Sequence, residues 1–329
     1  MIDYEGRSVL VTGGAGFIGS HLVEEFVRRG AEVTVVDNLS TGYTTNLAAV
    51  AERIELRELD LLHNDLRPLL TEKNFQTVVH VAANANVPAS VEDPRLDFEK
   101  NVVATLNLLD AVRDAAPHTH VLHTSSAAVY GRGSNTPTRE ENPATPVSPY
   151  GVSKLASEHY VAVYAQLYRL RTAILRLFPV YGPRLRKQVV YDLMRKVHRN
   201  PNELFIEGDG KQVRDFNHIT NVVEAYFVVA EGGRLNGEVY NVAAEETVTI
   251  HDLAQMICER MDVAPRFVYS GDARPGDMQR LNADISRLKS LDYRPCVSFA
   301  DGLDNTVAWF REEMTMTKVV SDLGLHYRN

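Results

Sequence analysis

Residues 8–19 read SVLVTGGAGFIG, and this stretch decides the fold. The apolar run 8–12 predicts a buried strand, and residues 17–29, apolar at helical spacing, predict a helix that a glycine ends. Three glycines lie between and just beyond them at three-residue spacing: Gly13, Gly16 and Gly19. Such glycines allow a tight turn and a close backbone approach to phosphates, while the free amides and dipole of the helix start hold a pyrophosphate. The stretch therefore predicts a dinucleotide-binding turn.

Carboxylates end the next two predicted strands. Asp37 follows the strand 32–36, where its carboxylate can bind both ribose hydroxyls of a dinucleotide and repel a 2′-phosphate. Because no arginine occurs in residues 38–42, we expect NAD rather than NADP. Asp60 ends the strand 54–59 and is placed to reach the adenine, although a helix cap or a solvated strand end explains it almost as well.

Strands and helices alternate through the first half of the chain. Further strands are predicted at 77–81, 120–124 and 172–175, with helices over 98–113 and from residue 149. This order implies right-handed crossovers, a parallel sheet, and ligands beyond the carboxyl ends of its strands. The predicted fold class is α/β: a Rossmann-type doubly wound parallel sheet with a smaller α/β C-terminal substrate domain. We expect the NAD-binding domain to span 1–178, with 219–248 returning to it, and the substrate domain to comprise 179–218 and 249–329.

Composition narrows the class of partner. Among 329 residues, 43 acidic groups outnumber 35 basic ones, which gives a net charge of −8 and disfavours nucleic acid and anionic membranes as partners. No apolar run is long enough for a membrane span, and we expect no signal peptide at the N-terminus. The two cysteines, Cys258 and Cys296, lack metal-ligand spacing, so we expect free thiols, no metal site and a cytoplasmic location.

A second chemical pattern starts the helix at residue 149. Ser148 and Pro149 suit its N-cap and first position, and the i,i+4 spacing then puts Tyr150 and Lys154 on one face. A lysine ammonium near a phenol, together with the positive nicotinamide ring, would lower the pKa of the phenol and make it a general base. The triplet Thr124-Ser125-Ser126 lies at the end of the predicted fifth strand, where one of its hydroxyls can hold the reacting oxygen. The alternative is a chance pair on an ordinary helix.

The chain resembles the extended short-chain dehydrogenase/reductase family, the nucleotide-sugar epimerases and dehydratases. The matching motifs spread over nearly the whole chain: TGGAGFIG (12–19), HVAA (80–83), Asn101, SSAAVYG (125–131), SPY (148–150) with Lys154, VYGPR (180–184), GDG (208–210) leading into RDF (214–216), RPGD (274–277) and Ala283-Asp284.

The resemblance implies a nucleoside-diphosphate sugar as substrate and a catalytic NAD. Tyr150 then removes the C4-hydroxyl proton while Ser126 bonds the same oxygen. The implied substrate contacts are Ser126, Pro179, Arg214 and Arg274, with both arginines on the diphosphate. The implied NAD contacts are Gly13, Gly16, Phe17, Ile18, Gly19, Asp37, Asn38, Asp60, Leu61, Ala82, Asn101, Tyr150 and Lys154.

The resemblance also implies a homodimer, in which the helices 98–113 and 149–167 pair across a two-fold axis. Val102, Leu106 and Leu109 lie at helical spacing and are candidates for that face, although burial within one subunit explains them equally well.

The branches of the family differ just after Ser126. The 4,6-dehydratases have Asp and Glu at the next two positions, and the decarboxylases have Glu at the second, whereas this chain has Ala127 and Ala128. The resemblance therefore favours a 4-epimerase acting on a UDP-hexose or UDP-uronic acid. Three departures bear on the substrate: Pro179 where Asn is common, Glu207 where an aromatic residue is common, and a short segment 184–190. A dehydratase or decarboxylase, and a non-catalytic NAD-binding protein, are the alternatives.

Overall fold

The computed structural model describes residues 4–131, 137–271 and 280–322. Its main sheet joins strands in the order β11-β6-β5-β4-β1-β2-β3, and all of its pairings are parallel. The strands are β1 (Ser8–Thr12), β2 (Glu32–Asp37), β3 (Ile54–Glu58), β4 (Thr77–His80), β5 (His120–Ser126), β6 (Arg171–Leu177) and β11 (Asn236–Val242). The strand order reverses beside β1, as in a doubly wound sheet.

Alternate residues of these strands face two separate apolar cores. Val9 and Val11 of β1 pack with α1 (Phe17–Arg28), the 3₁₀ helix η1 (Thr44–Arg53) and α8 (Ile219–Gly232). Leu10, between them, packs on the other face with α2 (Arg67–Lys73), α5 (Ala104–Ala115) and α6 (Pro149–Tyr168). A strand buried on both faces needs the continuous apolar run seen in the sequence, because successive side chains point to opposite faces. The predicted α/β sheet with helices on both faces is confirmed.

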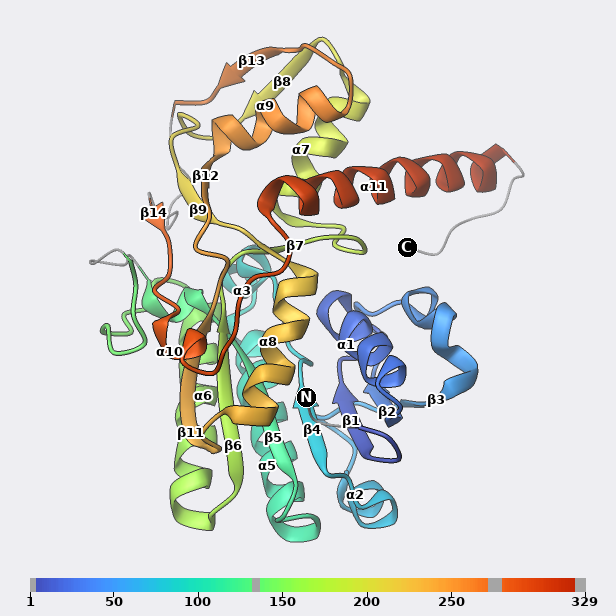
Figure 1. Ribbon diagram of the computed structural model, residues 1–329, viewed down its shortest axis with the longest axis vertical. Coiled ribbons are helices and arrows are strands. Elements are labelled where there is room, and N and C mark those ends of the chain that lie inside the picture. Colours follow the sequence, from blue (N-terminus) through green and yellow to red (C-terminus); the bar gives the residue numbers. More distant parts are fainter. Residues whose placement is uncertain (1–3, 132–136, 272–279, 323–329) are drawn as a thin grey trace.

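Most of the remaining chain forms smaller units beyond the carboxyl ends of the strands, whereas α10 (Ser286–Lys289) lies beside β11 (Figure 1). A third apolar core joins α7 (Gln188–Arg199), β8 (Glu203–Ile206), α9 (Ile250–Arg260) and α11 (Phe299–Asp322). β8 pairs with β13 (Arg266–Tyr269), and β9 (Val213–Asp215) lies between β12 (Thr247–Thr249) and β14 (Arg280–Leu281). β7 (Val180–Tyr181) pairs with β10 (Asn217–His218), and α10 (Ser286–Lys289) follows β14. The exact domain limits stay predictions.

The predicted cap of α6 is confirmed, and the start of α9 has a similar cap. The Ser148 hydroxyl accepts a hydrogen bond from the Gly151 amide at the start of α6, and Thr249 accepts one from the Asp252 amide at the start of α9. The helix predicted over 98–113 begins earlier and is not uniform. α3 (Val87–Glu92) and α4 (Pro94–Phe98) come first, and a π-helical turn η2 (Glu99–Val103) joins α4 to α5. Such turns inside helices often occur at functional sites.

Two further structural observations bear on the partners expected from sequence. Among the described helices, none combines the length and apolar character needed to cross a membrane. Val102 and Leu109 are buried within the chain itself, and Leu106 is partly buried against the same core as Leu109, so the intramolecular explanation of their spacing is the correct one.

Candidate active site

The glycine turn brings α1 close to two strands. A Cβ on Gly13, whose φ is +72°, would lie 2.6 Å from the Ala82 backbone nitrogen, and a Cβ on Gly19 would lie 2.1 Å from the Gly13 carbonyl oxygen. Gly16 is the N-cap of α1 and offers no side-chain acceptor, so the amides of the first helical turn, at Phe17 and Ile18, stay available to an anion. The turn fits a pyrophosphate.

Asp37 is fixed in place at the end of β2. Its two carboxylate oxygens accept hydrogen bonds from the Ala15 amide at 3.0 Å and the Leu39 amide at 2.9 Å. Burial raises the pKa of Asp37, and these two amides oppose that rise. Each carboxylate oxygen keeps a second lone pair, enough to accept from the two hydroxyls of a ribose. The residues present therefore fit the adenosine half of NAD.

The neighbouring cofactor candidates lie along the same edge of the sheet. Asn38 donates to the Asp60 carboxylate at 3.0 Å, which joins the ends of β2 and β3. Leu61 is buried, and its carbonyl accepts from Asn107 at 2.9 Å. Ala82 follows β4 beside Gly13. Strands that are neighbours in the sheet thus bring together residues that are distant in the sequence.

Ser126, Tyr150 and Lys154 come together where β5 meets α6. Ser126 is the last residue of β5, which is two residues longer than predicted, and its hydroxyl, which accepts from the Ala128 amide at 3.2 Å, lies close enough to the Tyr150 phenol to lower the pKa of that phenol. The Lys154 ammonium donates to the Thr124 carbonyl at 2.9 Å. Tyr150 and Lys154 are both buried, at 9% and 4% exposed. The structure therefore unites the three predicted catalytic residues.

Burial changes the electrostatics expected from sequence. It raises the pKa of Tyr150 to about 12, although the neighbouring Ser126 hydroxyl acts to lower it. It also lowers the pKa of Lys154 to about 8. The argument from sequence counted the attraction of the ammonium and of the nicotinamide ring for the phenolate and left out the cost of burying either charge. The phenol thus needs additional positive charge close by to work as a base near neutral pH.

A buried polar cluster behind this site was missed from sequence. Asn101 donates to the Asn84 carbonyl at 3.2 Å, the Asp97 carboxylate at 3.1 Å and the Ser153 hydroxyl at 2.9 Å. Ser90, also fully buried, accepts from the Tyr150 amide at 3.2 Å. Only one signal pointed to the cluster, which is the i,i+4 spacing of Asp97 and Asn101. The cluster fixes the cofactor candidate Asn101 against α6.

The predicted substrate contacts lie on other elements. Pro179 follows β6, and its carbonyl accepts from the Asn217 amide at 2.8 Å. Arg214 lies on β9, within the three-stranded sheet, and donates to the Val213 carbonyl. Arg274 lies outside the described residues. Ala127, 2% exposed, and Ala128 begin the 3₁₀ turn η3 (Ala127–Tyr130) directly after Ser126.

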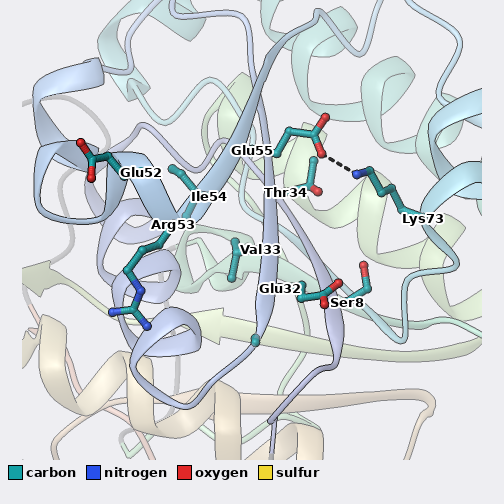
Figure 2. Close-up of a pocket in the computed structure, with 10 residues that line it drawn as sticks. Ser8, Glu32, Val33, Thr34, Glu52, Arg53, Ile54, Glu55 and Lys73 are labelled. Carbon is teal, nitrogen blue, oxygen red and sulfur yellow. Dashed lines mark ion pairs between the residues drawn. The ribbon is translucent and has the colours of Figure 1, made fainter.

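A hollow of about 360 Å³ lies at the opposite end of the sheet (Figure 2). Its lining comes largely from the amino ends of β1, β2 and β3, and two of its lining residues, Lys73 and Glu55, pair at 2.8 Å. Ligands of parallel sheets bind at the carboxyl ends, so this hollow is not the expected site. No group of three or more His, Cys, Asp or Glu side chains among the described residues is arranged to hold a metal ion.

Comparison with known proteins gives a consistent set of relatives. The model of the NAD dependent epimerase/dehydratase family matches residues 9–243. A putative UDP-glucose 4-epimerase of Methanocaldococcus jannaschii is 33% identical over 92% of this chain and 98% of its own. A dTDP-glucose 4,6-dehydratase of Xanthomonas campestris pv. campestris is 35% identical over 95% of each. The structure of Thermus thermophilus UDP-glucose 4-epimerase in complex with NAD superposes with a TM-score of 0.84 at 36% identity, covering 93% of this chain and 99% of the other.

Proposed function

The chain belongs to the NAD dependent epimerase/dehydratase family, and on that premise we propose that it inverts C4 of a nucleoside-diphosphate sugar. NAD is its cofactor, and a UDP-hexose or UDP-uronic acid is the substrate we favour. The observation that carries the choice of reaction is the pair Ala127 and Ala128 in the turn that follows Ser126.

The catalytic residues have distinct tasks. Tyr150 takes the proton of the C4 hydroxyl, and Ser126, whose hydroxyl lies beside the phenol, orients the same oxygen. Lys154, held by the Thr124 carbonyl, places its ammonium to favour the phenolate over the phenol. The chemistry that NAD supplies when bound is reversible acceptance of the C4 hydride. Return of the proton from Tyr150 completes the inverted hydroxyl.

The alternatives within the family need groups that this turn lacks. Removing water across C5 and C6 requires an acid for the leaving hydroxyl and a base for the C5 proton. The methyl groups of Ala127 and Ala128 can serve as neither, and Ala127 is almost fully buried. Oxidation and re-reduction at C4 need only the groups described above. This supports epimerisation over dehydration, although a relative named as a dehydratase is equally similar overall.

The test is the fate of a nucleotide sugar. We expect one member of a panel of UDP-, GDP-, CDP- and dTDP-sugars to give a product of unchanged mass that differs in C4 configuration, by mass spectrometry and proton NMR. In deuterated water C4 should gain no deuterium, because the hydrogen leaves and returns as hydride. Loss of water or carbon dioxide at a competent rate would overturn the epimerase assignment and leave the family membership intact.

We also propose that the protein works as a homodimer in the cytoplasm. Large apolar side chains stand exposed along α6, at Val152 (54%), Tyr160 (41%), Val163 (42%) and Leu167 (69%), with Val91 (63%) and Phe98 (50%) on α3 and α4. An exposed apolar stripe on neighbouring helices is typical of an interface. Both cysteines are free thiols, which suits a reducing compartment.

We expect light scattering at micromolar concentration to give twice the chain mass. Leu167→Glu, which puts a charge into the proposed interface, should shift the mass toward one chain. Met316→Glu is the matched control, because Met316 on α11 is similarly exposed (58%) away from α6, and it should leave the dimer intact. A monomeric unmodified protein would refute the proposal.

A further inference from the structure

We infer that Asp97 is a positioning residue of the catalytic site, whose buried carboxylate holds the turn of α6 between Tyr150 and Lys154 and is the counter-charge of the Lys154 ammonium. Its consequence for turnover rests on the proposed function. Its consequence for Lys154 does not.

The contacts of Asp97 suit a carboxylate. The side chain is fully buried, and three groups donate to it: the Ser153 hydroxyl at 2.6 Å, the Asn84 amide at 2.9 Å and the Asn101 amide at 3.1 Å. All three groups are neutral donors. Because an ionised carboxyl group can only accept hydrogen bonds, these donors match the needs of its two oxygens. A buried charge without such partners would be costly.

The position of Asp97 makes these contacts relevant to catalysis. Asp97 is the penultimate residue of α4, just before the π-helical turn η2, which carries Asn101. Ser153 lies on α6 one residue before Lys154 and three after Tyr150, so its bond to Asp97 ties α4 to the turn that bears both side chains. One carboxylate therefore fixes Asn101, a proposed cofactor contact, and the turn of α6 that carries Tyr150 and Lys154.

Four ionisable groups besides Tyr150 face Lys154, and their states differ. Glu158, on the same helix, is bound through both oxygens by Arg176, which offsets its charge. Burial, followed by the Lys154 charge, lowers the pKa of His80 on β4 to about 3 and that of His123 on β5 well below its usual range, so both are neutral. Asp97 is left as the negative charge that opposes loss of the Lys154 proton.

Asp97→Asn removes the charge and keeps the shape. The Ser153 hydroxyl can turn its proton to the Tyr150 carbonyl, 3.0 Å away, and accept from the new amide. We expect Lys154 to titrate about one pH unit lower in this variant, since a nearby opposite charge shifts a pKa by about that much or more. The measurement is NMR of protein carrying ¹³C-labelled lysine, with NAD bound and Lys154→Arg to assign the resonance.

The pH dependence of turnover should follow. If the ammonium form of Lys154 is the active one, a lower pKa means that this form is lost at a lower pH. The alkaline limb of the kcat/KM profile should therefore shift to lower pH by about one unit. Glu99→Gln is the matched control, because Glu99 is two residues away but 41% exposed at its side chain and paired with Arg95. It should move neither the resonance nor the limb.

The outcomes separate this inference from the proposed function. A folded Asp97→Asn protein in which Lys154 titrates as in the unmodified protein overturns the inference, whatever the substrate. Asp97→Ser, a second neutral variant, serves if Asp97→Asn does not fold. In the unmodified protein Lys154 must be an ammonium at pH 7. A Lys154 resonance that reports the neutral amine at this pH would also overturn the role of Asp97 as its counter-charge. Absence of any epimerisation defeats the proposed function alone, because the titration of Lys154 is still measured.

Discussion

Tyr150→Phe should nearly abolish turnover while leaving the fold and the bound NAD unchanged. The substitution removes one hydroxyl from a buried ring, so packing against its neighbours is kept. A positioned general base typically contributes about 10²–10⁴-fold to the rate, and we expect a loss in kcat of that size with little change in KM. Steady-state kinetics on the substrate found by the sugar panel, with circular dichroism and NAD content, measure it.

Two further variants show whether the loss belongs to the base. Tyr168→Phe removes a hydroxyl from an exposed tyrosine of the same helix and should leave turnover unchanged. Lys154→Ala should reduce activity and shift the acid limb of kcat/KM to higher pH, because the phenol, whose pKa burial already raises, would lose its nearby ammonium. A Tyr150→Phe protein that keeps most of its rate would show that another group removes the proton.

The parts of the fold predicted from sequence depend on local signals. The glycine turn, the strand β1 and the cap Ser148 were each predicted from a few consecutive residues. The edge of the sheet where the site lies followed from the parallel order alone, since carboxyl ends of neighbouring strands meet there. Asp37 and Ser126 could thus be placed without knowing any packing.

The rest depended on packing between distant segments. The helical spacing of Val102 and Leu109 fits an interface as well as a core, and the spacing alone does not say which neighbour covers them. Asp97 and Ser153 meet across 56 residues, through contacts between α4 and α6 that no local pattern encodes. The depth of burial, which dominates the pKa of Tyr150, is likewise a property of the packed molecule.

The largest effect on stability should come from the buried ion pair behind the site. Arg176 on β6 binds Glu158 on α6 through two parallel bonds, 2.9 Å and 2.7 Å long, and donates to the Tyr130 hydroxyl at 2.9 Å. The two charged side chains are 8% and 4% exposed. Removing one partner from such a pair leaves an uncompensated charge in the interior, which typically costs about 3–5 kcal/mol.

Arg176→Met should therefore lower the free energy of unfolding by about 3–5 kcal/mol at neutral pH, measured by urea denaturation. The orphaned Glu158 would favour its protonated form in the folded state, so its folded pKa would exceed its unfolded one and the loss of stability should shrink as the pH falls.

Replacing both partners, Arg176→Met with Glu158→Leu, should recover most of the loss, because no buried charge is left. Arg95→Met, which breaks a pair with exposed side chains (89% and 41%), should change stability by less than about 1 kcal/mol. If Arg176→Met alone were as stable as the unmodified protein, solvent would have to reach Glu158, and the pair would not be buried.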